Sequence, residues 1–472
     1  MISSDSGKES FIICRNSQGS VVRATVLRMT RHTVTFEVYN PYSILQNSEV
    51  LSEFKIFVGE RLIYSGKAVV SGIVNTGLLL ICEVSLGSSW LDIDFYSSLY
   101  HNKSLQPDFE KFLKDWAKVH TVLSNFKVLI ADIQIFLTEL KRWLDQVEFG
   151  IHSNPAINSP QFEKDMLGNI KDSVLRETRP LFERFEETTS KIEESLRAAH
   201  RFYARQQIHP LVLCSPLVHR AFQKPLGYAG DYEVINMILN EPFIGGSLFA
   251  KIVNFCFWSL PPAEAHRNRI DYLNQCLLQE TEKVLKEKKK NIKIFNLGCG
   301  PAKEIQNFIL NTEICNNAEL TLVDFNTETL SFTGKLLEEL KASKNRNIDF
   351  KTIKMSVHQI LKEAGKAEAL DLNSYDFVYC AGLFDYLTDR VCKRMVEIFY
   401  ELLAPGGLLV VTNVEAANPV TNMQEYILEW HLNHRGFNEM RNLAPATVLD
   451  NDIKIERDTT GVNIFLSIRK PS

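Results

Sequence analysis

Short apolar runs separated by turn residues dominate the first hundred positions of the chain, which is the pattern of an all-β segment. Gly59, Gly66 and Gly77 are among the turn residues that punctuate it. The apolar runs occupy positions 21–29, 33–38, 53–58, 61–64, 67–70 and 78–84. Short strands at this spacing predict a small closed β-barrel over residues 1–100.

From residue 106 the apolar positions recur at intervals of three and four, which predicts a long helix with one apolar stripe. The stripe starts at Phe109 and reaches Leu144, and a polar break follows at residues 154–160. A second helical pattern comes next, and Pro180 should kink or split it. We expect residues 106–207 to form a helical connector whose stripe packs as a bundle core, and through which the chain forms a homo-oligomer.

Strands and helices alternate only in the last part of the chain. Residues 208–290 are rich in aromatic residues and follow neither period, so we expect a helical cap and lid segment there. Residues 291–472 alternate apolar strands with helices, which predicts a doubly wound α/β domain.

Composition changes this picture mainly by exclusion. The chain has 472 residues, of which 45% are hydrophobic and 23% charged, as is typical of a water-soluble globular protein. Its formal net charge of -4 gives no argument for a nucleic acid partner, and we expect none. No secretory signal is visible, and no apolar stretch reaches the ~20 residues that span a bilayer. The nine cysteines lack a metal-ligand spacing, so we expect a cytoplasmic protein without a metal site.

The strongest candidate chemistry lies in the segment NIKIFNLGCGPAKEIQNF. A buried strand runs into Gly298-Cys299-Gly300 and a helix follows, so that the backbone can approach a ligand without an intervening Cβ. In LTLVDFN, Asp324 would end the next strand, where a carboxylate can accept hydrogen bonds from both ribose hydroxyls. The alternative is that Asp324 caps the following helix. For Cys299, packing is favoured over a nucleophilic role.

The ordered motifs GCGPA, VD, YDFVYCAGLFDYL and LLAPGGLLVV resemble those of class I S-adenosylmethionine (SAM)-dependent methyltransferases. The resemblance covers about residues 292–468 and implies SAM as the cofactor. The expected fold class is then α/β, with a Rossmann-like methyltransferase domain at 291–472 preceded by the helical connector and the small barrel. A dinucleotide dehydrogenase would carry a third glycine near Glu304, which this chain lacks. Asn296 departs from the family, which often has an acid there, and Ala302 replaces a common third glycine.

The resemblance assigns most of the cofactor site by position. The implied cofactor-binding residues are Asn296, Gly298, Gly300, Pro301, Asp324, Phe325, Ser356, Val357, Ala381 and Gly382. Within this set, Ser356 and Val357 would flank the adenine. The loop after the fourth strand normally faces the transferred methyl group, so Asp385 and Tyr386 would position the acceptor as catalytic residues, whereas Phe384 is expected to pack.

A narrower resemblance involves segments outside these motifs. HPLVLCSPLVHRAFQKPLGYAGDYEVINMI, AGLFDYL and EYILEWHLNHR are similar to a bacterial group that makes methyl esters of 3-hydroxy fatty acids as diffusible signals. This resemblance implies a small carboxylic acid as the acceptor. Such an acid is ionised at neutral pH, so alignment rather than a general base would drive the transfer. Arg435 would then act as a catalytic residue that orients the carboxylate.

The run GYAGDY at residues 227–232 is expected to form a lid over the cofactor end of the sheet. Its glycines permit a tight conformation, and Tyr228 and Tyr232 offer aromatic faces to the sulfonium. Together with Asp231 they are predicted cofactor contacts, and Tyr228 is also a predicted catalytic residue. The alternative is a turn that joins two domains.

The β-segment distantly resembles PilZ-type barrels, many of which bind cyclic di-GMP. Arg15, Arg23, Arg28 and Arg31 do not reproduce that family's R-x-x-x-R arm, so we expect a degenerate docking or regulatory barrel and no cyclic di-GMP partner. Two other functions stay open: an O-methyltransferase acting on another small molecule or on a protein carboxylate, and an inactive SAM-binding signalling scaffold. Asn296 favours the scaffold, whereas the intact glycines favour an enzyme.

Overall fold

The structure is a computed structural model that describes residues 10–30, 32–38, 45–58, 61–75, 80–87, 106, 110, 121–155, 159–363 and 371–472. The chain divides into two compact units. The first combines Met1–Ala229, Glu241–Trp258 and Val420–His431, and the second combines Gly230–Asn240, Ser259–Pro419 and Leu432–Ser472. The four predicted segments are thus distributed over two units, each assembled from three stretches of chain.

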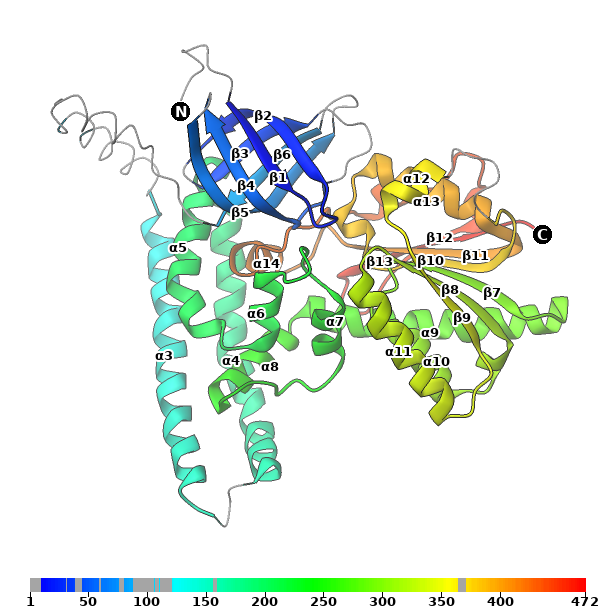
Figure 1. The fold of residues 1–472 in the computed structure, drawn as a ribbon. Helices are drawn as coiled ribbons and strands as arrows, with labels where there is room; N and C mark the ends of the chain where they lie inside the picture. Colours follow the sequence, from blue (N-terminus) through cyan, green and yellow to red (C-terminus); the bar gives the residue numbers. More distant parts are fainter. Residues whose placement is uncertain are drawn as a thin grey trace. The chain divides into compact units, whose positions relative to one another are not determined.

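A closed barrel of six antiparallel strands lies in the first unit, which confirms the predicted barrel (Figure 1). The strands are β1 (Ser10–Arg15), β2 (Val21–Met29), β3 (Thr33–Val38), β4 (Val50–Val58), β5 (Arg61–Asn75) and β6 (Leu80–Leu86). They follow the order β1-β2-β3-β6-β5-β4, and the pairing of β1 with β4 closes the barrel. Alternate residues of β3 are buried, so each strand turns one apolar face inward. The predicted turn residues Gly59 and Gly77 lie outside the described residues.

Helices complete the described part of the first unit. They are α3 (Ser124–His152), α4 (Pro160–Ser190), α5 (Glu194–Val212), α6 (Pro216–Gln223), α8 (Leu248–Trp258) and α14 (Thr421–Ile427). Phe109 and residues 111–120, where the predicted stripe begins, lie outside the described residues. No helix in the described ranges is both long and apolar enough to cross a membrane.

Helix α4 starts and continues for identifiable reasons. The side-chain oxygen of Ser159 accepts the N–H of Phe162 at 3.2 Å, which caps the first turn. Of the two predicted effects of Pro180, a split is wrong, because α4 runs through this position as one helix, and a kink stays a prediction. A proline removes one backbone hydrogen bond, and the buried residues Val174 and Phe185 on either side hold the two halves against neighbouring helices.

The second unit is built on a seven-stranded sheet, which confirms the predicted α/β class (Figure 1). The strands are β7 (Ile292–Leu297), β8 (Ala318–Asp324), β9 (Asp349–Lys354), β10 (Tyr375–Cys380), β11 (Leu403–Val414), β12 (Ile453–Arg457) and β13 (Asn463–Arg469). Their order is β12-β13-β11-β10-β7-β8-β9, in which β13 pairs antiparallel with β12 and with β11 and the other pairs are parallel. The central strands β7 and β10 are almost wholly buried, as parallel strands covered on both faces should be.

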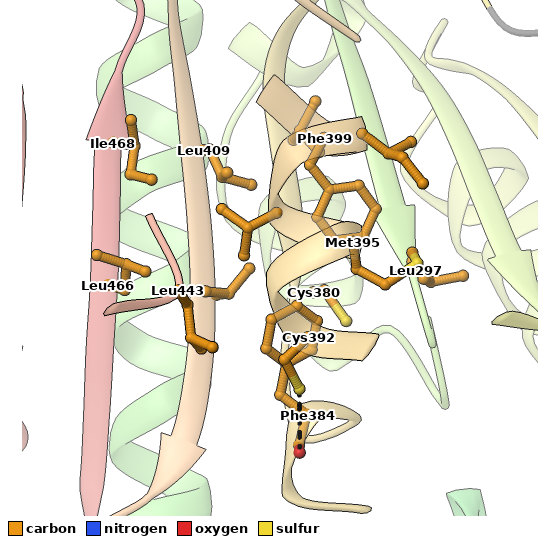
Figure 2. Close-up of a cluster of buried hydrophobic side chains, with 14 of the residues drawn as sticks. Leu297, Cys380, Phe384, Cys392, Met395, Phe399, Leu409, Leu443, Leu466 and Ile468 are labelled. Carbon is orange, nitrogen blue, oxygen red and sulfur yellow. Dashed lines mark hydrogen bonds between the residues drawn. The ribbon is translucent and has the colours of Figure 1, made fainter. Parts of the chain in front are cut away.

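Helices cover both faces of this sheet (Figure 1). On one face lie α9 (Pro261–Lys288), α10 (Lys303–Asn311) and α11 (Thr327–Ser343), and on the other lie α12 (Val357–Glu363), α13 (Asp389–Leu402) and α15 (Phe437–Asn442). Figure 2 shows the second layer, where Phe384, Met395 and Phe399 lie in one apolar cluster with Leu409 and Leu466. Phe384 is fully buried, which confirms that it packs.

The order of strands along the chain reverses between β7 and β10, which are neighbours in the sheet. β8 and β9 continue from β7 on one side, and β11 follows β10 on the other. The loops leaving the carboxyl ends of two such strands diverge and open a crevice where ligands bind. Gly298 follows β7 and Gly382 follows β10, so two predicted cofactor loops meet at this edge, which we call the carboxyl edge.

Candidate cofactor and acceptor site

The glycine turn after β7 is closed by internal hydrogen bonds. Gly298 and Gly300 have φ values of +69° and +50°, a region that favours glycine. The N–H groups of Gly298 and Cys299 donate to the carbonyl oxygen of Val323 at 2.8 and 3.1 Å. A Cβ placed on Gly300 would meet no atom within 4 Å. The space above Gly300 is therefore open to a ligand.

The same hydrogen bonds bear on which nucleotide fits. The N–H of Gly300 donates to Asp324 Oδ2 at 3.3 Å, that of Ala302 donates to the carbonyl oxygen of Cys299 at 2.9 Å, and Pro301 has none. A pyrophosphate at a helix N-terminus requires free backbone N–H groups. Most backbone N–H groups of this turn already donate to oxygens of the protein. The turn therefore favours SAM, a nucleoside without phosphate, over a dinucleotide. Burial raises the pKa of the Cys299 thiol well above its ordinary value, which fits a packing residue.

Asp324 ends β8 and is only 5% exposed. Its Oδ1 accepts the N–H of Asn326 at 2.9 Å and its Oδ2 accepts that of Gly300, which leaves each oxygen a second acceptor position for a ribose hydroxyl. Burial raises the pKa of this carboxyl to about 6, against the lowering effect of the backbone N–H groups. Asn326 caps α11 instead, because its side chain accepts the N–H of Thr329 at 3.0 Å. Phe325, between these two residues, is half-buried.

Ser356 and Val357 lie where α12 begins. The N–H of Ser356 donates to Gln359 Oε1 at 2.8 Å, and its Oγ accepts the N–H of Gln359 at 3.3 Å. Val357 packs in the apolar layer beneath α12. The N–H of Met355 donates to the carbonyl oxygen of Asp324 at 3.0 Å, which ties this segment to the end of β8. The pair lies near the ribose candidate, and its contact with adenine stays a prediction.

A buried carboxylate stands next to Asn296. The Nδ2 of Asn296 donates to Glu304 Oε1 at 3.4 Å, and the hydroxyl of Tyr379 donates to the same oxygen at 2.8 Å. Glu304 is 4% exposed, and burial raises the pKa of its carboxyl. Glu304, in the first turn of α10, thus places a carboxyl group beside Asn296, where the family often has an acid. Sequence reasoning missed Glu304, although it stands within the quoted motif GCGPAKE.

Arg269, on α9, is the second residue that sequence reasoning missed. It is 6% exposed, and within the described part of the chain its Nε and one terminal nitrogen have no hydrogen-bond partner. Its guanidinium lies 3.0 to 3.3 Å from the point where Gly382 would carry a Cβ, and Gly382 has a φ of +84°. Burial lowers the pKa of this guanidinium, and the charges of Asp385 and Glu304 oppose that shift. No sequence motif marks the position, because only the tertiary fold brings it to the carboxyl edge.

The loop after β10 ties Asp385 to the end of β11. Asp385 Oδ1 accepts the N–H of Val414 at 2.6 Å, and its carbonyl oxygen accepts the N–H of Asn433 at 2.6 Å. Burial raises the pKa of this carboxyl, against the charges of Arg269 and Arg435. The half-buried residues Ala381 and Tyr386 flank this loop segment. Their proposed contacts with cofactor and acceptor stay predictions.

Arg435 is fully engaged in hydrogen bonds. One terminal nitrogen donates to the carbonyl oxygen of Phe384 at 2.8 Å and to Asn413 Oδ1 at 2.6 Å. The other donates to the carbonyl oxygen of Leu387 at 2.6 Å, and Nε donates to Asp389 Oδ1 at 2.9 Å. The residue is 1% exposed. Its predicted role at an acceptor carboxylate is untested, and these contacts do not favour it.

The predicted lid is shared between the units. Asp231 caps α7 (Tyr232–Leu239), where its Oδ1 accepts the N–H groups of Glu233 and Val234 at 3.1 and 3.0 Å. The hydroxyl of Tyr232 donates to Glu328 Oε1 at 3.0 Å, on the first turn of α11. Tyr228 belongs to the first unit. The lid itself stays a prediction.

The residues at the carboxyl edge fit SAM. The turn is open above Gly300, Asp324 can hold the ribose, and Glu304 lies where an ammonium would be attracted. Arg269 has donors for a carboxylate, which both the amino-acid end of the cofactor and an acid acceptor carry.

One comparison with known proteins, a match to a family model, agrees with this site. A family model described as a methyltransferase domain matches residues 288–456. Among solved structures, a protein from Bordetella parapertussis described as a possible exported protein matches 68% of this chain and 99% of its own, at 15% identity and a TM-score of 0.42. Magnesium protoporphyrin IX methyltransferase from Synechocystis PCC 6803, solved with bound SAM, matches 44% and 82%, at 12% identity and a TM-score of 0.30. The CurJ carbon methyltransferase matches 68% and 72%, at 11% identity and a TM-score of 0.34. No curated protein matches the sequence significantly.

Because these structural likenesses are low, the assignment rests on the family model and on the geometry of the site. The matched residues include the glycine turn, Asp324 and the loop that follows β10. Residues 288–456 are accordingly a methyltransferase domain, and the geometry of its carboxyl edge fits SAM as the cofactor.

Proposed function

We propose that this enzyme transfers the methyl group of SAM to the carboxylate of a small organic acid, and that 3-hydroxy fatty acids are the acceptor class to test first. The observation that carries the proposal is Arg269, a buried guanidinium with two nitrogens that lack a partner within the described part of the chain. A buried cation with free donors is costly unless an anion completes it. The narrower sequence resemblance adds that the product serves as a bacterial signal.

The chain's own residues then have a limited task. When bound, SAM supplies a methyl group activated by its sulfonium. Transfer of that methyl group to an ionised carboxylate would require no proton transfer, so the chain would supply no general base. Since a carboxylate is already ionised at neutral pH, the protein must orient it and exclude water. Arg269 offers N–H donors to a carboxylate, and its guanidinium lies so close to Gly382 that this position leaves no room for a side chain.

The acceptor class is tested with methyl-labelled SAM and the full-length chain. The panel pairs 3-hydroxy fatty acids of several lengths with the matching amides and alcohols. We expect label in the acids alone, in a product that mild base hydrolyses to methanol, as a methyl ester requires. Label that resists base, or that appears in alcohols or in protein, would replace the proposal with another methyltransferase. SAM binding without any turnover would favour the signalling scaffold.

Arg269→Gln and Arg269→Lys test the residue itself. If Arg269 holds the acceptor, the KM for the acid should rise in Arg269→Gln while the Kd for SAM, measured by calorimetry, stays unchanged. Arg269→Lys should restore part of the loss, because it keeps the charge but not the planar fork. A raised Kd for SAM with an unchanged Kd for methylthioadenosine, which lacks the amino-acid end, would assign Arg269 to the cofactor. The structural support for an acid acceptor would then be lost.

A further inference from the structure

The first unit contains a cavity of about 660 Å³ that the methyltransferase assignment does not use. Helix α5 forms much of its wall, and the end of β6 and the segments after α5 form other parts. Arg201, Arg205 and His209 recur at every fourth position of α5, so one face of the helix presents all three to the cavity. Arg201 and Arg205 therefore give the cavity a basic wall.

The remaining wall is largely apolar and aromatic. Phe202 stacks on His32, with ring centroids 4.7 Å apart. Phe222 meets His209 edge to face at 4.4 Å, and Leu213 also lines the space. Rings and an aliphatic side chain of this kind bury apolar parts of a ligand. The lining as a whole is amphipathic.

Each of the two arginines that line the cavity pairs with one acid. Arg201 donates to Glu425 at 3.0 Å, and Arg205 forms an ion pair with Glu429. The Nε of Arg201 is buried and has no hydrogen-bond partner within the described part of the chain. Lys224, 3% exposed, donates to the carbonyl oxygen of Leu428 at 2.9 Å rather than to an acid.

Burial and the neighbouring positive charges lower the pKa of each of these basic groups. Burial lowers the pKa of Arg205 to about 9, and the charge of Arg201 adds to the shift. Burial lowers the pKa of Lys224 to about 7, with the charge of Arg205 adding to it. Burial and the same cations lower the pKa of His209 to about 4, although its hydrogen bond to a carbonyl oxygen opposes this. An added anion would relieve this mutual repulsion.

We propose that this cavity is a second ligand site, which binds an organic anion with an apolar body. Its anionic group meets Arg201 and Arg205, and its apolar body lies against Phe202, Leu213 and Phe222. A cavity with both a basic wall and an aromatic wall selects for a ligand that carries both features. The proposal does not depend on the acceptor proposed above, because every residue that carries it belongs to the first unit.

Cys214 offers a direct readout of binding. It lines the cavity and is exposed, whereas the other eight cysteines of the chain are buried. The experiment measures the rate at which iodoacetamide alkylates Cys214 in the native full-length chain, followed by mass spectrometry of the labelled peptide. The probes are decanoate, decanol and inorganic phosphate, each without SAM. We expect decanoate to slow alkylation several-fold and saturably, and we expect decanol and phosphate to have much smaller effects.

Gln206 provides a matched pair of variants at the rim. It is exposed and lines the cavity, so Gln206→Glu and Gln206→Lys differ in charge without touching the core. Gln206→Glu should weaken protection by decanoate about fivefold relative to Gln206→Lys, as expected for a charge change near a surface anion. Arg201→Gln should abolish protection, and circular dichroism would show whether that variant keeps its fold.

Three outcomes would overturn the second site. Equal protection by decanol and decanoate would reduce it to an apolar groove without a role for the arginines. Equal protection by phosphate would reduce it to a simple charge patch. No protection by decanoate, or no difference between the two Gln206 variants, would remove the anion site altogether.

Discussion

The region around Arg435 and the region around Arg269 hold the same side chain at the same edge of the sheet, yet they differ in how that side chain is satisfied. All three side-chain nitrogens of Arg435 donate hydrogen bonds to oxygens of the loop after β10, of β11 and of α13. Arg269 lies against the same loop with two nitrogens that lack partners within the described part of the chain. A buried charge that its own fold completes indicates structure, whereas one left incomplete indicates a ligand.

Arg435→Met should have the largest effect and should act on stability. It removes charged donors from the carbonyl oxygens of Phe384 and Leu387 and from Asn413 Oδ1, at about 1–3 kcal/mol each, so we expect a total loss of about 3 kcal/mol or more. Arg269→Met should change the free energy of unfolding by less than about 1 kcal/mol, since an incomplete buried charge is replaced by an apolar chain. Urea titrations followed by circular dichroism measure both. Equal losses would abolish the distinction between the two regions.

Asp324→Ala extends the comparison to a buried carboxylate whose oxygens can each accept a further hydrogen bond. We expect SAM binding to weaken by about 1–3 kcal/mol, because hydrogen bonds to a charged group are lost. Asn326→Ala is the control, since it removes the cap of α11 but keeps the carboxylate. That variant should lose stability and keep its affinity. An unchanged Kd in folded Asp324→Ala, measured by calorimetry, would contradict the ribose assignment.

The pH dependence of SAM binding should follow the same carboxyl. The pKa of Asp324 in the free chain is about 6, and ribose hydroxyls donate to the ionised form. Affinity should therefore be full above pH 6 and fall as the pH drops below it, by at most about tenfold per unit. Asp324→Asn should bind weakly and lose this step. Calorimetry at pH 5, 6 and 7.5 tests both curves, and parallel profiles would show that another group titrates.

Substitution of Tyr232 should have the smallest effect on stability. It tests whether a third side chain beside the site has a structural or a functional role. Its hydroxyl bonds an exposed glutamate, Glu328, so Tyr232→Phe should cost about 0.5–1 kcal/mol of stability at most. Its ring lies 4.7 Å from that of Phe332, which also belongs to α11. If the lid prediction holds, Tyr232→Ala lowers turnover by a larger factor than it lowers stability. Equal losses in both would return Tyr232 to a structural role.

The parts of the site that follow from local sequence could be predicted, and the parts assembled by tertiary contacts could not. In a parallel sheet, a glycine turn after one strand and an acid after the next strand lie at the same edge. Gly298, Gly300 and Asp324 could therefore be predicted from the sequence. Arg269 stands in the middle of α9 with no neighbouring motif, and its importance depends on Gly382, far along the chain. Arg435 was chosen for its charge, and no sequence pattern shows that nearby carbonyl groups occupy it.

The same division applies to the fold. Alternating apolar runs and turns sufficed for the barrel, because each strand needs only a period of two and a turn. The split considered at Pro180 does not occur, because the cost of a lost hydrogen bond is local while the packing that compensates it is not. The sequence also could not predict that the stretch Val420–His431 belongs to the same unit as the barrel. It depends on contacts such as the hydrogen bond from Ser48 Oγ to the carbonyl oxygen of His431, at 2.7 Å.

That late stretch bears on how the protein is made. As the ribosome extends the chain, the barrel and long helices emerge well before the stretch from Val420 to His431 that belongs with them, because much of the second unit is synthesised in between. Until then Ser48 lacks its partner, and Glu186, whose carboxylate accepts the N–H groups of Asn422 and Met423 at 3.0 and 2.6 Å, has nothing to cap. Each unit must therefore finish after translation has passed through the other. No single cut in the backbone yields two complete products, and a nascent chain released early leaves an unfinished surface for chaperones or proteases to recognise.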